Sequence, residues 1–283
     1  MINQKSAGAL DSISGTEYPE VFDLIDTSRY PVHQPASKKY KELVSDCLEQ
    51  MKSNGYCLLQ GFMKEEALEL MVREAREIAP FAFHNTLTGN AYLTPQDPDL
   101  DDDDVRKIED TTALGAVAYD QVPNGSALRR LYEWDGLMEF LADALGYERL
   151  YRYDDHLGAL NLAVMKEGDH LRWHFDQTDF VVSLLIQDCL AGGKYEVYPK
   201  TRSAEEENFD LVKDIVKNNR REGILTLDIK PGCLVLFKGR HSLHRVTTVQ
   251  GDVDRLIALF GYDTSSGVCG SDYLKMIRYG RIK

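Results

Sequence analysis

Two histidines and one aspartate in this chain are spaced so that they can hold one metal ion. His174 and Asp176 lie two positions apart, so on a strand both side chains project from one face while Phe175 turns away. His244 follows 70 residues after His174, which leaves room for it to arrive from another strand. Two imidazoles and one carboxylate leave three positions open on the ion, which suits Fe(II), whereas structural zinc takes four closed ligands. We call these three residues the triad, and they predict an iron centre.

An arginine further along the chain has the chemistry to bind a carboxylate beside such an ion. Arg255 lies 11 residues after His244, which is the distance around one hairpin through the turn at Gly251. A guanidinium group grips a carboxylate with two parallel hydrogen bonds, which a lysine cannot match. His241 competes for the third ligand position, and His244 is favoured because Arg255 follows it at hairpin distance.

The composition is typical of a globular protein with a full core. The 283 residues are 43% hydrophobic and 28% charged, with a formal net charge of −13. An acidic chain without a basic stripe argues against a nucleic-acid partner, and no apolar run reaches the roughly 18 residues of a membrane span. The polar N-terminus shows no secretory signal, and the five cysteines include no CxxC pair. We therefore expect a cytoplasmic protein with reduced thiols, and its oligomeric state stays open.

Helical patterns dominate the first half of the chain. Residues 1–35 read as a loosely structured lead-in, and helices are predicted over 37–54, 64–78 and 126–145. Residues 84–120 show little periodicity, so a long surface excursion is expected there, either functional or disordered.

From Leu150 onward the pattern changes to short strands separated by turn residues. One helical insert is expected over 205–221. The expected strands are Ala159–Met165, Phe180–Gln187, Tyr195–Tyr198, Ile224–Ile229, Cys233–Phe237, His241–Val246 and Leu256–Tyr262.

Many short strands with regular turns predict a sandwich or barrel. The expected fold class is therefore α+β and mainly β, a jelly roll of two sheets with the N-terminal helices packed on one sheet. No shift in composition separates two units, so we expect one domain over residues 1–283. Within it, a mainly helical portion (1–149) precedes the jelly-roll core (150–265) and a C-terminal tail (266–283).

The segment from about Asp155 to Asp263 resembles the Fe(II)/2-oxoglutarate-dependent oxygenase superfamily, which has a cupin-like double-stranded β-helix core. Within that superfamily the chain is most similar to the BesD-like group of halogenases and hydroxylases acting on free amino acids and other small molecules, through Asn90-Ala-Tyr-Leu-Thr and the residues around His244. The segments that carry the superfamily resemblance are Gly168-Asp-His-Leu-Arg-Trp-His-Phe-Asp, Gly192-Gly-Lys-Tyr-Glu, Pro231-Gly-Cys-Leu-Val-Leu-Phe and Ser242-Leu-His-Arg-Val, together with Arg255.

The resemblance implies roles for the residues singled out above. The triad would hold Fe(II), and Arg255 would bind the distal carboxylate of 2-oxoglutarate. Many relatives carry a hydroxyl residue two positions after this arginine, where the present chain has Ile257. Another donor must therefore help to bind the carboxylate, and Asn161 or Thr247 is expected to do so.

The resemblance also separates two reactions. Halogenating relatives replace the carboxylate of the triad by Gly or Ala, which frees a position for chloride, whereas this chain keeps Asp176. We therefore expect a dioxygenase that uses O2 to hydroxylate an unactivated C–H bond of a small molecule, a free amino acid being the expected substrate. The alternatives are desaturation or cyclisation with the same cofactors, a peptide substrate, and a metabolite sensor without enzymatic activity.

Substrate contacts are expected beside the triad. Gln177 and Asp179 follow the ligand pair, and His170 precedes His174 by four positions, so these three are the candidate substrate residues. A carboxylate such as Asp179 could meet the amine of an amino acid, or it could simply be a solvated loop residue. The excursion over residues 84–120 is a candidate lid, because such chemistry benefits when water is excluded.

Overall fold

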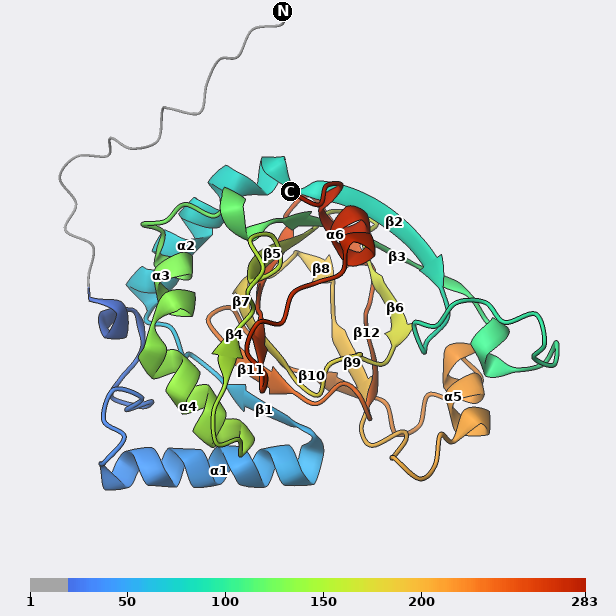
Figure 1. Ribbon diagram of the computed structural model, residues 1–283, viewed down its shortest axis with the longest axis horizontal. Helices are drawn as coiled ribbons and strands as arrows, with labels where there is room; N and C mark the ends of the chain where they lie inside the picture. Colours follow the sequence, from blue (N-terminus) through green and yellow to red (C-terminus); the bar gives the residue numbers. More distant parts are fainter. Residues whose placement is uncertain (1–19) are drawn as a thin grey trace, which may run out of the picture.

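Strands of the chain form two facing sheets in the computed structural model, which describes residues 20–283 (Figure 1). Residues 1–19 of the expected lead-in lie outside the described residues. The larger sheet has the strand order β1 (Tyr56–Leu59), β11 (Leu234–Phe237), β7 (Val181–Gln187), β14 (Arg255–Phe260), β5 (Leu160–Met165), β3 (Asp110–Val117), β2 (Phe83–Gly89). The smaller sheet has the order β10 (Leu225–Leu227), β9 (Tyr195–Tyr198), β12 (Leu243–Val246), β6 (Leu171–His174).

Two short strand pairs complete the described sheets. They are β8 (Ala191–Gly192) with β13 (Val249–Gln250), and β4 (Tyr151–Arg152) with β15 (Tyr262–Asp263). All pairings between named strands are antiparallel. The expected fold class, mainly β with a jelly-roll core, is thus confirmed, and each strand expected after Leu150 corresponds to an observed strand.

The helices lie mostly outside the larger sheet (Figure 1). They are α1 (Lys38–Asn54), α2 (Glu65–Ile78), α3 (Ala127–Glu133), α4 (Asp135–Leu145), α5 (Phe209–Val216) and α6 (Asp272–Tyr279), with 3-10 turns at Val21–Leu24, Ala79–Phe81, Val105–Lys107 and Tyr119–Gln121. Among the described residues, no helix is long and apolar enough to cross a membrane. All five cysteines are free thiols.

The ends of α1 show why this segment is helical. The Ser37 side chain accepts a hydrogen bond from the N–H of Tyr40, which satisfies one of the orphan donors of the first turn. Gly55 ends the helix in the left-handed conformation. The chain then enters β1, and the helix predicted over residues 37–54 is confirmed here.

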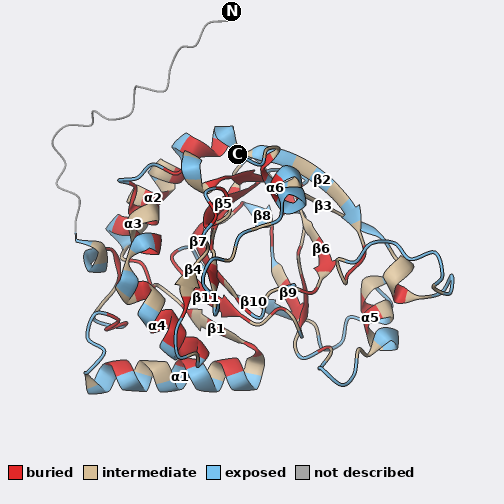
Figure 2. Cartoon of the chain, viewed as in Figure 1, coloured by how far each residue is buried: buried red, intermediate tan, exposed pale blue. Residues whose placement is uncertain are grey.

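Two separate hydrophobic clusters occupy the two faces of the larger sheet. Helices α1 to α4 pack on the outer face, and their buried residues Leu131, Leu137, Phe140 and Leu141 share one cluster with the outward residues of β5, β7, β11 and β14. A second cluster lies between the two sheets. Figure 2 shows buried residues concentrated along the strands and on the inward sides of these helices.

The expectation of a structureless excursion over residues 84–120 is wrong. Its two ends form β2 and β3, which pair with each other and extend the larger sheet from β5. Strand β2 is an edge strand with polar, largely exposed residues, so it lacks the apolar alternation that marks a strand in sequence. Only the part between Gly89 and Asp110 runs outside the sheets, and it contains one 3-10 turn.

Three further boundaries differ from the predictions. The helix expected over 126–145 is broken at Trp134, whose extended backbone ends α3 and begins α4, with Asp135 favourably placed in the first turn. The insert expected over 205–221 is helical only in α5. The C-terminal tail contains α6, capped by the Ser271 side chain at one end and by Gly280 at the other.

Candidate metal centre

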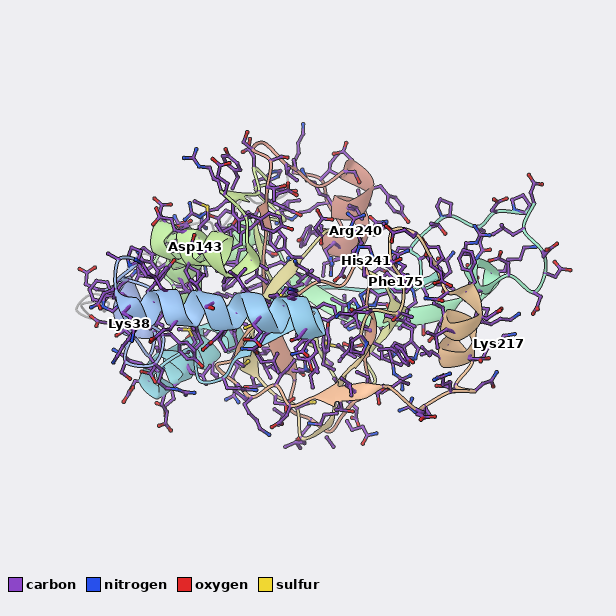
Figure 3. The ribbon with its side chains drawn as sticks, turned by 90° about the horizontal axis from the view of Figure 1, so that it is seen from below. Lys38, Asp143, Phe175, Lys217, Arg240 and His241 are labelled. Carbon is purple, nitrogen blue, oxygen red and sulfur yellow. The ribbon has the colours of Figure 1, made fainter. Side chains whose placement is uncertain are left out.

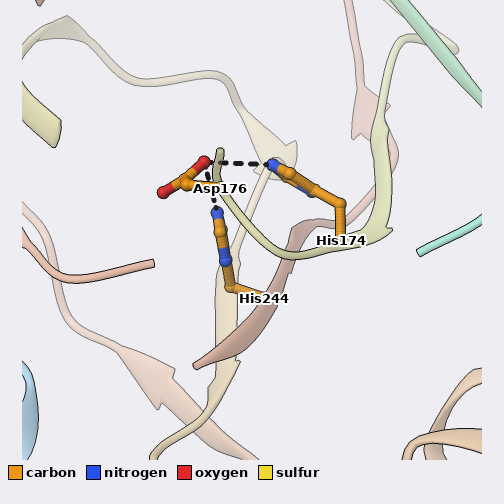
Figure 4. Close-up of side chains that lie close together, drawn as sticks. All are labelled: His174, Asp176 and His244. Atoms are coloured by element: carbon orange, nitrogen blue, oxygen red, sulfur yellow. Dashed lines mark ion pairs between the residues drawn. The ribbon is translucent and has the colours of Figure 1, made fainter. Parts of the chain in front are cut away.

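The triad is assembled by two paired strands of the smaller sheet. His174 is the last residue of β6 and lies directly opposite His244 on β12. This register brings the two imidazole rings to a centroid distance of 4.1 Å. Asp176 follows β6, and its N–H donates a hydrogen bond of 3.1 Å to the carbonyl of Gly239, on the segment that leads into β12. Figure 4 shows the three side chains converging.

The distances between the ligand atoms suit one divalent ion. Oδ1 of Asp176 lies 3.7 Å from Nε2 of His174 and 3.6 Å from Nε2 of His244. An ion about 2.1 Å from each ligand atom fits between atoms this far apart. Oδ2 of Asp176 is buried without a hydrogen-bond partner among the described residues. The donor set therefore fits Fe(II), and its second carboxylate oxygen lacks the partner that a purely structural aspartate would have.

Backbone carbonyls orient both imidazoles. Nδ1 of His174 lies 2.9 Å from the carbonyl of Arg172, and Nδ1 of His244 lies 2.9 Å from that of Ser242. A carbonyl accepts only, so each Nδ1 carries the proton and each Nε2 keeps its lone pair. These hydrogen bonds thus select the tautomer that a metal needs.

The protonation states at the triad also suit a metal. Burial, reinforced by the neighbouring His244, lowers the pKa of His174 to about 3, so its imidazole is neutral at physiological pH. Burial alone would raise the pKa of Asp176, but the two histidines outweigh it and the pKa is lowered. An anionic carboxylate thus faces the neutral imidazole of His174.

Gly239 leaves the space that the carboxylate occupies. A Cβ atom at this position would overlap Oδ2 of Asp176 and would lie 2.9 Å from Cε1 of His244. Any other residue would therefore displace the aspartate or the histidine. The sequence contained no signal for this role, because Gly239 lies in an unremarkable turn between two strands.

Arg255 lies inside the molecule at the start of β14, opposite Met165 on β5. Its side chain is buried, and its Nε has no hydrogen-bond partner among the described residues. A cavity of about 190 Å³ adjoins it, lined in part by Tyr195 and Lys194. Gly193 permits this arrangement, because a Cβ atom there would crowd the Arg255 side chain. A buried, unsatisfied guanidinium beside a cavity fits the carboxylate of 2-oxoglutarate.

Tyr195 is a residue of this cavity that the sequence interpretation did not single out. It lies on β9, and its ring stacks on the ring of His244 with 5.6 Å between the centroids. The charge of Arg255 acts to lower the pKa of its hydroxyl. Burial, with the Asp176 carboxylate nearby, raises its pKa well above the usual value, so the phenol stays protonated. Ile257, by contrast, lies among apolar residues of the inner cluster. The signal that could have revealed Tyr195 is its place within the Gly192-Gly-Lys-Tyr-Glu segment.

The two donors expected to assist Arg255 have different surroundings. Asn161 lies on β5 with its side chain buried, and its Oδ1 has no partner among the described residues. Thr247 follows β12, and its hydroxyl accepts a hydrogen bond of 2.9 Å from the N–H of Lys194. Asn161 is therefore open to a ligand on one side, whereas Thr247 is already engaged.

Two candidate substrate residues, Gln177 and Asp179, directly follow Asp176 in the chain, whereas His170 lies beside β3. Gln177 is exposed and Asp179 forms a 2.7 Å ion pair with Arg240, which also donates to the carbonyl of Gln177. His170 bonds to the hydroxyl of Thr111 at 2.9 Å, on β3. All three are thus engaged with the protein, and an amine would have to compete with Arg240 for Asp179.

His241 takes no part in the metal-binding group. The group of described residues that can hold a metal consists of His174, Asp176 and His244. His241 is exposed on the segment beside Arg240 (Figure 3).

The C-terminal helix adds a positive charge near the triad. Helix α6 packs against β2 and β3, and the side-chain amide of Asn85 donates to the carbonyl of Ile277 at 2.9 Å. Tyr279 joins the cluster between the sheets. Arg278 is exposed, and its charge contributes to lowering the pKa of Asp176.

Solved structures of similar fold are oxygenases. An oxidoreductase of the 2OG-Fe(II) oxygenase family from Burkholderia pseudomallei is 13% identical, with 80% of this chain and 92% of that chain covered and a TM-score of 0.50. A prolyl hydroxylase from Trichoplax adhaerens, in complex with a peptide fragment, is 15% identical over 80% and 91% of the two chains, with a TM-score of 0.51. HygX from Streptomyces hygroscopicus, with nickel and 2-oxoglutarate bound, is 12% identical over 77% and 85%, with a TM-score of 0.52. These likenesses show that the chain shares the fold of these proteins.

Comparison of the sequence with known protein families identifies the family of the chain. Residues 105–271, more than half of the chain, match the family described as Halogenase D, and the chain belongs to this family. It is an enzyme of the Fe(II)/2-oxoglutarate-dependent oxygenases, with Fe(II) and 2-oxoglutarate as cofactors. A search of curated proteins finds no match.

Proposed function

We propose that this enzyme hydroxylates an unactivated C–H bond of a small molecule, a free amino acid being the best candidate, as in the BesD-like group. The observation that carries the proposal is the complete triad, in which Oδ1 of Asp176 lies within 3.7 Å of both Nε2 atoms. A hydroxylase needs its three open positions for 2-oxoglutarate and oxygen, and the carboxylate occupies the place that a halide would need.

In this proposal the protein supplies position and polarity. The triad holds Fe(II), while Arg255 binds the distal carboxylate of 2-oxoglutarate and the protonated Tyr195 phenol donates to it in place of the hydroxyl that Ile257 lacks. Fe(II) with 2-oxoglutarate supplies the oxidation of a C–H bond by O2, with release of succinate and CO2. Asn161 orients the keto-acid end by donating from its side-chain NH2 group.

The family's description does not decide between hydroxylation and halogenation, because related sites on one fold support different outcomes. What favours hydroxylation is specific to this chain. Gly239, which has no side chain, leaves the space that the Asp176 carboxylate occupies. The two histidines lower the pKa of that carboxylate and so keep it anionic. The carboxylate therefore fills the space that a chloride ion would need.

The surroundings of the triad favour a small molecule over a peptide. Helix α6 packs over the β2–β3 side, and the segment from Asn90 to Thr94 borders the ligand pair, since Phe175 donates to the Ala91 carbonyl at 2.9 Å. Desaturation or cyclisation of the same substrate remains the alternative outcome, since both begin with the same oxidation. The cytoplasmic location stays a prediction from sequence.

The test is succinate release from protein loaded with Fe(II) under anaerobic conditions and then given 2-oxoglutarate, oxygen and each proteinogenic amino acid in turn. Stimulation by one or a few of them, with a product one oxygen atom heavier, is expected. Stimulation only by peptides would contradict the small-molecule proposal, and a product two hydrogens lighter would contradict hydroxylation.

A further inference from the structure

Arg172 is a buried arginine on the inner face of β6, two positions before the metal-binding His174. Trp173, between them, belongs to the cluster on the opposite face, with Val212 and Ile215 of α5. Side chains alternate along a strand, so Arg172 and His174 project to the same side. The contact of Arg172 with Thr112 agrees, because Thr112 alternates on β3 with Leu114, a member of the cluster between the sheets.

The positive charge of Arg172 has no counter-ion within ion-pair distance among the described residues. The carboxylates of Asp110 and Glu109 act on it from farther away, and burial still lowers its pKa. Nη1 donates to the hydroxyl of Thr112 at 3.0 Å and to the carbonyl of Leu87 at 3.4 Å, and Nε donates to the carbonyl of Asn90 at 3.4 Å. Every partner is neutral, and Nη2 has no hydrogen bond to any described residue. The residue is nevertheless only 9% exposed. A buried cation is costly unless it is paired, so the arrangement calls for an anion from outside the chain.

The position of the side chain links it to the reacting centre. Its guanidinium reaches the carbonyl of Asn90, and the next residue, Ala91, accepts a hydrogen bond from Phe175, directly after His174. Arg172 therefore lies on the smaller sheet with the metal ligands, and its guanidinium contacts β3 and the end of β2, whereas Arg255 lies on β14 of the larger sheet.

We propose that Arg172 binds the carboxylate of the substrate, with Nη2 as its donor, so that the enzyme selects small molecules carrying a carboxylate. This inference rests on the proposed oxidation of a small molecule and adds the group by which that molecule is recognised. The carboxylate is held at the β2–β3 side, and the remaining carbons of the substrate face the open positions of the metal. Thr112 positions the guanidinium by accepting from both Nη1 and the N–H of Arg172.

The test measures binding by calorimetry to protein loaded with Zn(II), which has no redox chemistry, and saturated with 2-oxoglutarate. The probes are the free amino acids, simple monocarboxylic acids, and the amides and decarboxylated amines of the amino acids. Wild-type protein is expected to bind one or more carboxylates and not their amides or amines. Arg172→Met should weaken that binding by roughly 30-fold or more, and Arg172→Lys by less.

Two controls make the result specific. Arg245→Met removes an arginine from the outward face of the same sheet, where it pairs with Glu196 at 2.7 Å, and it should keep the wild-type affinity. The Kd of 2-oxoglutarate should change less than about threefold in Arg172→Met, which separates this residue from Arg255. If Arg172→Met does not fold, Thr112→Val, which removes the orienting hydroxyl, should still weaken carboxylate binding by about threefold to tenfold.

The outcomes distinguish the inference from the proposed function. Equal binding of an amino acid and its amide, or an unchanged Kd in Arg172→Met, would overturn the carboxylate anchor and leave amino-acid hydroxylation standing. Binding of other carboxylic acids alone, dependent on Arg172, would support the anchor and contradict the amino-acid substrate. Binding of no carboxylate in the panel would contradict both.

Discussion

The two faces of the larger sheet are built from the same strands but have different tasks. The outer face is covered by α1 to α4 and is almost wholly apolar, with outward residues such as Leu162, Leu184 and Ala258 fully buried. The inner face carries Arg255, Asn161 and Ser183, all buried, and looks toward the sheet that holds the triad. Strand alternation thus lets one strand contribute to packing and to chemistry at successive positions.

Three buried polar atoms without partners lie on the face that does chemistry, although the Tyr92 hydroxyl and the Trp173 indole N–H, in the cluster beside α5, also have no partner among the described residues. Oδ1 of Asn161, Nε of Arg255 and Oδ2 of Asp176 are all buried without partners among the described residues, and all lie between the two sheets. Burying a polar group without a hydrogen bond costs free energy, so such atoms are explained when a ligand completes them. Substitutions on the inner face should therefore alter binding and turnover, and those on the outer face only stability.

The largest effect is expected at the metal. Asp176→Ala should lower turnover by more than about 1,000-fold, because a first ligand to the ion is lost. The measurement is substrate-dependent succinate release at saturating Fe(II). His241→Ala, which removes an exposed histidine close in sequence to His244, should leave the rate unchanged; loss of activity there instead would mean that the ligands are misassigned.

The next effect is expected at Arg255. Arg255→Met should raise the KM for 2-oxoglutarate by about 100-fold, because a bidentate, charge-assisted contact is lost in a buried site. Arg255→Lys should recover part of this, since the charge returns without the fork geometry. An unchanged KM in the methionine variant would place the cosubstrate elsewhere.

Gly239→Ala tests the space around the carboxylate. The added methyl group would overlap Oδ2 of Asp176, so Fe(II) affinity should fall by about 10-fold to 100-fold while the fold is kept. Anaerobic metal titration with circular dichroism as a check on folding measures both. Wild-type affinity in this variant would show that the aspartate is not held where the structure places it.

A smaller effect is expected at Tyr195. Tyr195→Phe keeps the ring stacked on His244 and removes only the hydroxyl, so the KM for 2-oxoglutarate should rise by about 10-fold. Tyr198→Phe is the matched control on the same strand, because that ring packs with the cluster on the outward face. If both variants behave like the wild type, the cosubstrate is held without a phenol.

On the outer face the comparison predicts a change in stability alone. Leu141→Ala on α4 empties a fully buried position and should lower the free energy of unfolding by about 2–5 kcal/mol. Chemical denaturation measures this loss. Fe(II) affinity and the KM for 2-oxoglutarate of the folded variant should equal those of the wild type, and a change in either would break the separation of the two faces.

The sequence was most informative where local spacing decides the geometry. The two-residue spacing of His174 and Asp176, and the hairpin distance from His244 to Arg255, are properties of strands and turns, so they could be recognised without the fold. The strands after Leu150 were predictable for the same reason. The choice of His244 over His241 rested on the same hairpin distance, and the structure brings His244 to the other two residues.

What the sequence could not reveal depends on contacts between distant segments. Strand β2 has no apolar alternation, and only its pairing with β3 makes it a strand. The absence of a counter-ion at Arg172 and the space required at Gly239 depend on neighbours more than 60 positions away, such as Leu87 for Arg172 and Asp176 for Gly239. No local pattern encodes such contacts, so buried polar atoms became informative only with the fold in hand.

The central claim, that a complete triad makes this member of the Halogenase D family a hydroxylase, is tested most directly by the identity of the product. The reaction is run with Fe(II), 2-oxoglutarate, the stimulating substrate, isotopically heavy O2 and excess chloride, and the product is analysed by mass spectrometry. We expect a product that carries one heavy oxygen atom and no chlorine. A chlorinated product from the wild-type enzyme would contradict it.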